Sequence, residues 1–307
     1  PDDDNQEPDD YEDLVEQAAL AIIQELGWHY EDPVSIAPDG PNKQRTSNGE
    51  VVLLDLLTAA ARRINPDIPE EALQSALRQV QISETPSLIE ENRRIHRLLV
   101  DGIDVEYRRP DGSIKGDKVR LIDFAQVSNN DLMVTNQFTV VENGHNRRPD
   151  VVAFVNGLPL VVIELKNAAS ENATIQDAFN QLQTYKLQIP SLFRTNAALI
   201  TSDGLLARVG SLSANEDRFM PWRTVTGARD DFTPEGPKEM ETLIRGLFQP
   251  EYLLQLVRNF TVFGDKGDGT LKIIAGYHQF HGARKALTSA IEAVAEQGDR
   301  KVGVIWH

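Results

Sequence analysis

Apolar residues recur at helical spacing over several stretches of the chain. Between Leu14 and Leu26 they return every three or four residues and stop at Gly27, which predicts an amphipathic helix with a glycine after its last turn. The same spacing predicts further helices over residues 51–64, 70–80, 86–99, 173–187, 239–248, 250–260 and 277–294.

Shorter apolar stretches rich in β-branched residues predict strands. They cover residues 103–108, 118–124, 132–142, 149–155, 158–166, 197–201, 205–209, 222–225 and 302–306. Turn residues at 109–112 and at Asn156-Gly157 predict two hairpins, whereas the glycines of 264–269 predict a flexible loop. Strands interspersed with helices predict an α/β fold, in which a mixed sheet is flanked by helices.

The strand predicted over residues 158–166 ends in two charged residues. Side chains alternate along a strand, so Glu164 and Lys166 share one face with Val162. Both faces of this strand are otherwise apolar, which predicts that it is covered on both sides. An unpaired charge in such a place costs several kcal/mol, so a partner must compensate for it.

The register of the hairpin around Asn156-Gly157 decides whether a second carboxylate meets Glu164. A two-residue loop would place Asp150 opposite Ile163, whereas a three-residue loop over 156–158 would place Asp150 opposite Glu164. A type I turn with a bulge at Gly157 would provide the longer loop. We predict this register, because only it makes a metal site.

Two convergent carboxylates followed by a lysine suit the hydrolysis of a phosphodiester. Carboxylates are ligands of the kind that Mg²⁺ prefers, and Mn²⁺ can substitute for it. A bound divalent ion acidifies a water and stabilises charge on phosphorus, and Lys166 can orient the hydroxide or neutralise the phosphate. The pattern also allows a purely structural Glu164–Lys166 ion pair, with Asp150 as a surface acid after a turn.

Composition narrows the class of protein. The chain has 307 residues, no cysteine and a formal net charge of −16, with eight acids among its first 13 residues. The lack of cysteine excludes disulfides, cysteine zinc sites and a thiol nucleophile, and an acidic surface disfavours nucleic-acid binding outside a local basic cleft. The longest apolar run, 158–163, is too short to cross a membrane, and the acidic start does not resemble a signal peptide. A cytoplasmic protein without a membrane partner is expected.

Several motifs carry a resemblance to known nucleases. Pro149-Asp150 and Glu164-Leu-Lys166 resemble the two half-motifs of PD-(D/E)xK nucleases. The segments around them, above all Asn136-Gln-Phe-Thr-Val140 and Phe154-Val-Asn-Gly-Leu-Pro-Leu160, resemble the R (motor and endonuclease) subunit of type I restriction enzymes. The resemblance implies a restriction-endonuclease-like fold and Mg²⁺-dependent cleavage of double-stranded DNA that is not sequence-specific in itself. Asp150, Glu164 and Lys166 would be catalytic, with the two acids binding the metal.

The resemblance implies further site residues. Gln181 and Tyr185 fill a Q-x-x-x-Y motif that positions DNA, although their spacing alone also fits a buried tyrosine beside a solvated glutamine. Related nucleases carry an acid on the first helix that reaches the metal; Glu16 is the candidate here, with Glu12 and Glu25 as competitors. Arg148, together with Arg147, could meet phosphate or pair with Asp150 or Glu142.

The resemblance also implies a domain order. A nuclease domain would cover residues 1–235, with an acidic tail over 1–13, followed by a helical connection over 236–260. Residues 261–307 would begin a RecA-like motor domain and stop before its P-loop, and Gln279 matches a glutamine that contacts adenine. The full-length protein would use ATP and join modification and specificity subunits, the latter reading the DNA target. Alternatives are a catalytically silent scaffold with a nuclease fold and a stand-alone DNA repair nuclease.

Overall fold

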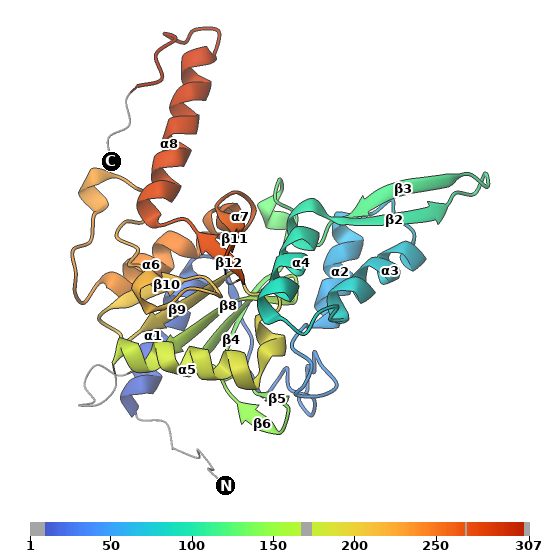
Figure 1. Cartoon of the computed structure of the whole chain (residues 1–307), viewed down its shortest axis with the longest axis horizontal. Coiled ribbons are helices and arrows are strands. Elements are labelled where there is room, and N and C mark those ends of the chain that lie inside the picture. Colours follow the sequence, from blue (N-terminus) through green and yellow to red (C-terminus); the bar gives the residue numbers. More distant parts are fainter. Residues whose placement is uncertain (1–9, 167–173, 268, 304–307) are drawn as a thin grey trace.

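A six-stranded mixed sheet forms the centre of the molecule (Figure 1). The computed structural model describes residues 10–166, 174–267 and 269–303 of the chain. In spatial order the strands are β1 (His29–Tyr30), β4 (Leu132–Asn136), β7 (Val151–Val155), β8 (Leu158–Leu165), β9 (Ala198–Ser202) and β10 (Ala207–Gly210). The pairs β1–β4 and β8–β9 are parallel and the other neighbours are antiparallel, so the predicted mixed sheet is confirmed.

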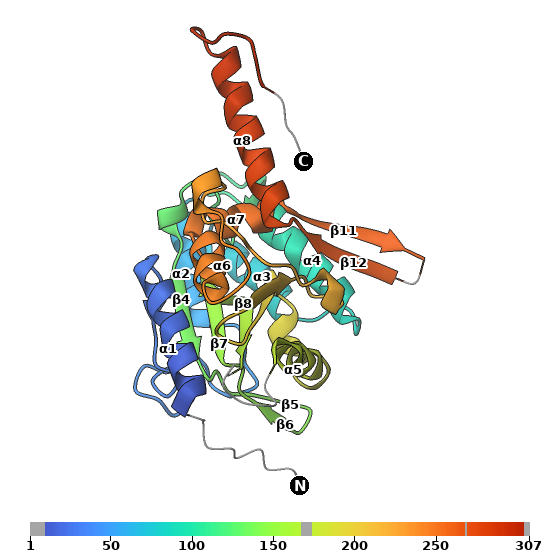
Figure 2. The same ribbon diagram turned by 90° about the vertical axis from the view of Figure 1, so that its left-hand side faces the viewer.

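Helices cover both faces of this sheet. Helix α1 (Asp10–Glu25) contacts β4 and β8 on one face, and helix α5 (Ile175–Gln188) packs on β8 and β9 from the other, as Figure 2 shows. The remaining helices are α2 (Leu54–Ile64), α3 (Glu70–Gln81), α4 (Leu88–Asp101), α6 (Glu239–Leu247), α7 (Pro250–Asn259) and α8 (Tyr277–Val294). Within the described ranges, no helix combines the length and the apolar character needed to cross a membrane.

Alternation along β7 explains why the sheet is covered twice. Val151 and Ala153 belong to the apolar cluster on the side of α1, whereas Val152 and Phe154 belong to the cluster that includes residues of α5. Every residue of β7 and β8 is buried, as the two apolar faces predict. Asp150 and Glu164, at the ends of these strands, are therefore held by core packing on both sides.

Three hairpins and several single turns complete the fold. The hairpin strands are β2 (Ile103–Arg108), β3 (Ile114–Val119), β5 (Val140–Glu142), β6 (His145–Arg147), β11 (Thr261–Lys266) and β12 (Gly269–Ile274). The 3₁₀ turns are η1 (Val127–Asn129), η2 (Pro190–Phe193), η3 (Glu216–Arg218) and η4 (Arg229–Asp231). The β2–β3 hairpin and α8 project from the body in different directions (Figure 1).

Four strand or loop predictions were wrong. The second strand of the first hairpin lies over Ile114–Val119 instead of 118–124, because pairing starts directly after the turn, at Arg108 with Ile114. The strand predicted over 132–142 is split into β4 and β5 by a backbone turn at Gln137, which has a φ of 46°. Residues 264–266 lie in β11 and Gly269 begins β12, because the glycines of this stretch suit a tight hairpin.

The fourth error concerns residues 222–225, which form no strand. Trp222 is buried, and Gly246 of α6 lies so close to its indole that a β-carbon there would be 2.4 Å from Nε1. This segment is apolar because it packs against a helix, not because it pairs in the sheet. Most of the strand predicted over 302–306 lies outside the described residues, and the domain boundaries at 235 and 260 stay predictions.

Gly157, in the β7–β8 turn, is a sensitive point of the fold. Its φ is +77°, and a β-carbon there would lie 2.4 Å from the backbone oxygen of Leu53, whose N–H donates to Gly157 O at 2.9 Å. We expect Gly157→Ala to lower the free energy of unfolding by about 3 kcal/mol, since left-handed strain adds to a steric clash. Urea denaturation measures the change.

Gly112 provides the matched control. Its φ is +86°, but a β-carbon there would meet nothing within 4 Å. Gly112→Ala is expected to cost only about 1–2 kcal/mol from backbone strain. Equal losses in the two variants would show that Leu53 does not constrain the turn.

Candidate active site

The β7–β8 hairpin places Asp150 across from Glu164. Val151 pairs with Ile163, so the next position toward the strand ends joins Asp150 and Glu164, as predicted. The route to this register differs from the prediction. The loop has two residues, with φ values of 52° at Asn156 and 77° at Gly157, and the extra residue is a bulge in β8 at Leu160.

The bulge also changes which face Leu160 occupies. Leu160 packs in the same apolar cluster as its neighbour Val161, on the side of α1, instead of sharing a face with Glu164 as alternation predicts. Beyond the bulge, Val162 lies in the cluster on the side of α5. Glu164 therefore faces α5, and Asp150 meets it from the same side of β7.

Glu164 is a fully buried acid. Burial raises the pKa of its carboxyl well above the ordinary value, and the nearby Asp150 raises it further, whereas Lys166 opposes the shift. Lys166 Nζ donates to Glu164 Oε1 at 3.4 Å. In the part of the chain that the structure describes, Glu164 Oε2 has no hydrogen-bond partner. The ion pair alone thus leaves one buried carboxylate oxygen unsatisfied.

The carboxyl group of Asp150 is held by fixed donors. Its Oδ2 accepts a hydrogen bond from the backbone N–H of Leu165 at 2.7 Å, and its Oδ1 accepts one from Gln137 Nε2 at 3.3 Å. The backbone N–H of Lys166 donates to Ser202 O at 2.8 Å, which ties the end of β8 to β9. Asp150 is therefore an oriented group, not a surface acid after a turn.

Helix α5 brings Gln181 and Tyr185 to this pair. Thr174 caps the helix by accepting from the N–H of Asp177, and Asp177 Oδ2 accepts from the N–H of Thr174 at 2.8 Å. Gln181 Nε2 donates to the hydroxyl of Tyr185 at 2.6 Å, which confirms that the two side chains share a face. Burial raises the pKa of Tyr185, and so do the negative charges of Glu164 and Asp150.

Glu16 reaches the site through Gln137. The carboxylate is buried and accepts from Asn136 Nδ2 at 2.6 Å and from Gln137 Nε2 at 2.7 Å. Of the two competing acids, Glu25 forms an ion pair with Arg245 at 2.7 Å, and the side chain of Glu12 is outside the described part. Glu16 is the acid of α1 that the structure links to Asp150.

The remaining predicted residues make other contacts. Arg148 is exposed, whereas its neighbour Arg147 is half-buried and donates from Nε to Gln188 Oε1 at 2.5 Å. Gln279 accepts from the N–H of Gly276 at 3.1 Å at the start of α8, and its role toward a nucleotide stays a prediction. The structure adds Gln137, which carried no assigned role; its only signal was its place in a segment that resembles R subunits.

Comparison with known proteins identifies the family. Residues 11–218 match the family model described as type I restriction enzyme R protein N terminus. The chain belongs to this family. It is 41% identical over 298 residues to the HindI endonuclease subunit of Haemophilus influenzae, covering 96% of this chain and 28% of the relative. It is 31% identical over 314 residues to a Methanocaldococcus jannaschii protein provisionally named as the MjaIXP endonuclease subunit, and the alignment covers 96% of this chain and 29% of that relative.

The chain thus spans less than a third of these two endonuclease subunits of type I restriction enzymes. The recognised R protein region ends at residue 218. It contains Glu16, Asp150, Glu164 and Lys166 together with Gln137, Gln181 and Tyr185, whereas Gln279 of α8 lies outside it. The site is therefore a feature of the R protein N terminus and not of the segments that follow.

The carboxylate oxygens of this site suit a divalent cation. No cluster of three or more His, Cys, Asp or Glu side chains with metal-binding geometry occurs among the described residues. Mg²⁺, however, is usually held by one or two carboxylates, with water and substrate phosphate completing its shell. Asp150 supplies an oriented carboxylate, and the unpartnered Oε2 of Glu164 supplies a buried oxygen that a cation would satisfy.

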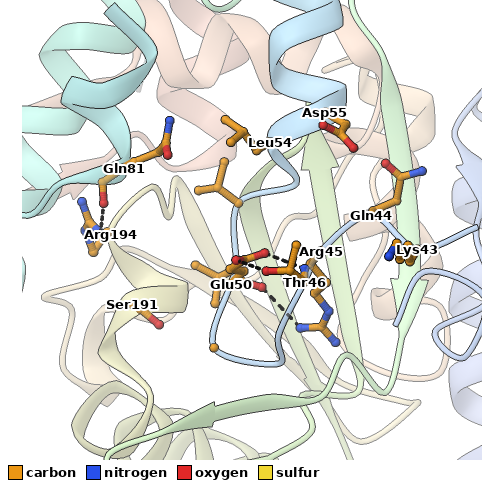
Figure 3. A pocket seen from close by; sticks show the side chains of 13 residues that line it. Lys43, Gln44, Arg45, Thr46, Glu50, Leu54, Asp55, Gln81, Ser191 and Arg194 are labelled. Atoms are coloured by element: carbon orange, nitrogen blue, oxygen red, sulfur yellow. Dashed lines mark hydrogen bonds between the residues drawn. The ribbon is translucent and has the colours of Figure 1, made fainter. Parts of the chain in front are cut away.

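A separate cavity of about 390 Å³ lies between the loop around Arg45, the start of α2 and η2 (Figure 3). Arg45 is buried, donates from Nη1 to Thr139 O at 2.7 Å, and stacks over the ring of Phe138. Glu50 Oε2 accepts from the N–H of Thr46 at 2.7 Å. These contacts fold the loop, and none of the site carboxylates lines this cavity.

Proposed function

We propose that this chain is the DNA-cleaving part of a type I restriction enzyme R subunit. It would cut double-stranded DNA without reading sequence, in a reaction that depends on Mg²⁺. The observation that carries the proposal is the carboxylate pair, in which half-buried Asp150 lies across from fully buried Glu164 with Lys166 two residues on. The membership of the family supports the same activity.

Each residue of the site has a role in this proposal. Asp150 and Glu164 would hold the cation, which when bound supplies an acidified water and charge stabilisation at phosphorus. Lys166 stands beside Glu164 with its side chain 15% exposed, so its ammonium can reach both the carboxylate pair and a phosphate in solvent. Gln181 and Tyr185 would align the DNA strand over the pair, and exposed Arg148 would contact its backbone.

The proposal extends to the whole restriction enzyme. The full-length subunit would act in the cytoplasm with modification and specificity subunits, and the specificity subunit would choose the DNA site. Residues 261–307 would begin an ATP-driven motor of RecA-like domains. This division fits a chain with a net charge of −16 and no evident base-reading element.

Cation binding by this chain tests the proposal directly. Calorimetric titration with Mn²⁺ is expected to show binding that Asp150→Ala abolishes, because the variant loses one of only two carboxylate ligands. Asp104→Ala is the control, since that carboxylate is 83% exposed and pairs with Lys118 on the β2–β3 hairpin. Equal binding by parent and Asp150→Ala, or no binding by the parent even with DNA present, would favour a silent scaffold.

A further inference from the structure

One side-chain amide joins the first helix to the carboxylate pair. Gln137 directly follows β4, at the end of the sheet where β7 begins and β8 ends. Its Nε2 donates to Glu16 Oε2 at 2.7 Å and to Asp150 Oδ1 at 3.3 Å. An amide nitrogen carries two N–H groups, so one nitrogen serves two carboxylates from different elements.

The backbone of Gln137 serves the same purpose. Its φ of 46° lies in the left-handed region, which a glutamine seldom adopts. In this conformation its N–H donates to Asp150 O at 3.0 Å. Main chain and side chain of one residue thus both bond to Asp150, which is a reason for the chain to keep a strained conformation here.

Glu16 determines which end of the Gln137 amide faces the site. An ionised carboxylate only accepts hydrogen bonds, so the side of the amide that faces Glu16 must be NH₂ and not oxygen. Glu16 is itself fixed, since its other oxygen accepts from Asn136 Nδ2 at 2.6 Å. Tyr30 extends the network, with its hydroxyl donating to Asn136 Oδ1 at 2.8 Å.

We propose that Gln137 is a positioning residue, and that Glu16 acts on the site through it. Gln137 fixes Oδ1 of Asp150 while the N–H of Leu165 fixes Oδ2, so the carboxylate is oriented before a cation arrives. The inference rests on the proposed function, because the orientation matters only where Asp150 is a ligand. It assigns a function to a glutamine and explains why a buried acid on α1 faces an amide.

Mn²⁺ calorimetry with matched variants tests the role of the side chain. Gln137→Gly removes the amide and accepts the left-handed backbone, and we expect it to weaken Mn²⁺ binding about 10- to 100-fold. Gln137→Asn tolerates the same φ, but its amide is one methylene shorter, so we expect it to weaken Mn²⁺ binding as Gln137→Gly does. Asn143→Gly is the control, because Asn143 has a φ of 52° in the exposed β5–β6 turn and should bind Mn²⁺ as the parent does.

The outcomes separate the two proposals. If Gln137→Gly binds Mn²⁺ like the parent while Asp150→Ala does not, the carboxylates hold the cation and the positioning role is wrong. If the parent binds no Mn²⁺, the proposed function fails. Whether Gln137 holds the Asp150 carboxylate is then tested by a measurement that needs no metal. Glu16→Gln is expected to weaken binding as Gln137→Gly does, and undiminished binding would show that Glu16 does not act through the amide.

Hydrogen exchange provides the measurement without metal. The N–H of Leu165 is protected by Asp150 Oδ2, whereas the neighbouring N–H of Lys166 is protected by Ser202 O. We expect Gln137→Gly to speed exchange at Leu165 about tenfold relative to Lys166, because the freed Asp150 carboxylate leaves its donor. An unchanged ratio of the two rates would show that Gln137 does not hold Asp150.

Discussion

Replacing Lys166 with methionine is expected to slow DNA cleavage by the assembled restriction enzyme about 100- to 1,000-fold, the usual cost of removing one preorganised donor from a reacting centre. Methionine keeps an unbranched apolar side chain and removes the ammonium that lies 3.4 Å from Glu164 Oε1. Asp150 and Glu164 remain in place, so Mn²⁺ binding is expected to persist. Loss of rate without loss of the cation would make Lys166 a catalytic residue.

The rate is best measured by nicking and linearisation of a supercoiled plasmid that carries recognition sites, with ATP and Mg²⁺ present. Lys115→Met is the control, because its ammonium forms an ion pair with Asp117 at 2.7 Å on the β2–β3 hairpin. Cleavage at the parent rate by Lys166→Met would reduce Lys166 to a structural counter-ion of Glu164. A parallel loss of Mn²⁺ binding would mean that the ammonium is needed to shape the cation site.

The meeting of Asp150 and Glu164 could be predicted from the sequence, but the way the chain achieves it could not. Local chemistry predicted a turn at Asn156-Gly157, and the need for convergent acids selected the register. The bulge is at Leu160 and not at Gly157, because a strand bends where its packing on both faces requires it. That packing involves residues far along the chain, which no local pattern contains.

Gln137 shows the same limit for the site. A glycine at this position would have indicated a left-handed backbone, but the sequence has a glutamine, and no neighbouring residue predicts that conformation. Its partner Glu16 is 121 residues away, and only the docking of α1 on the sheet brings the two together. The motif residues were predictable because they belong to one hairpin and the helix after it, whereas the groups that orient them come from separate elements.

Replacing Glu164 with glutamine is expected to stabilise the protein while removing its cation site. The pKa of Glu164 is raised in the folded state, mainly by burial. The folded state therefore favours the protonated acid. This preference adds to the free energy of unfolding in full below about pH 4.5, the ordinary pKa, and the contribution is lost as the pH rises through the raised pKa. Glutamine is neutral at every pH, so the advantage of the variant should grow from pH 5 to pH 8. At pH 8 we expect a gain of at least about 1 kcal/mol, since each unit by which burial raises the pKa corresponds to about 1.4 kcal/mol and the ammonium of Lys166, whose side chain is 15% exposed, keeps contact with water.

Urea unfolding at pH 5 and pH 8, in the presence of a chelator, measures this difference. Glu16→Gln is the matched substitution, because Glu16 is also a buried acid but both of its oxygens accept hydrogen bonds. It should lower the free energy of unfolding, because the NH₂ group of the new glutamine would face the NH₂ group of Asn136 or Gln137. Added Mn²⁺ should stabilise the parent but not Glu164→Gln, since only a cation that binds the folded state raises its stability. Opposite signs for the two substitutions would mean that Glu164 is kept for the cation at a cost to folding, whereas a loss in both would make Glu164 a structural acid.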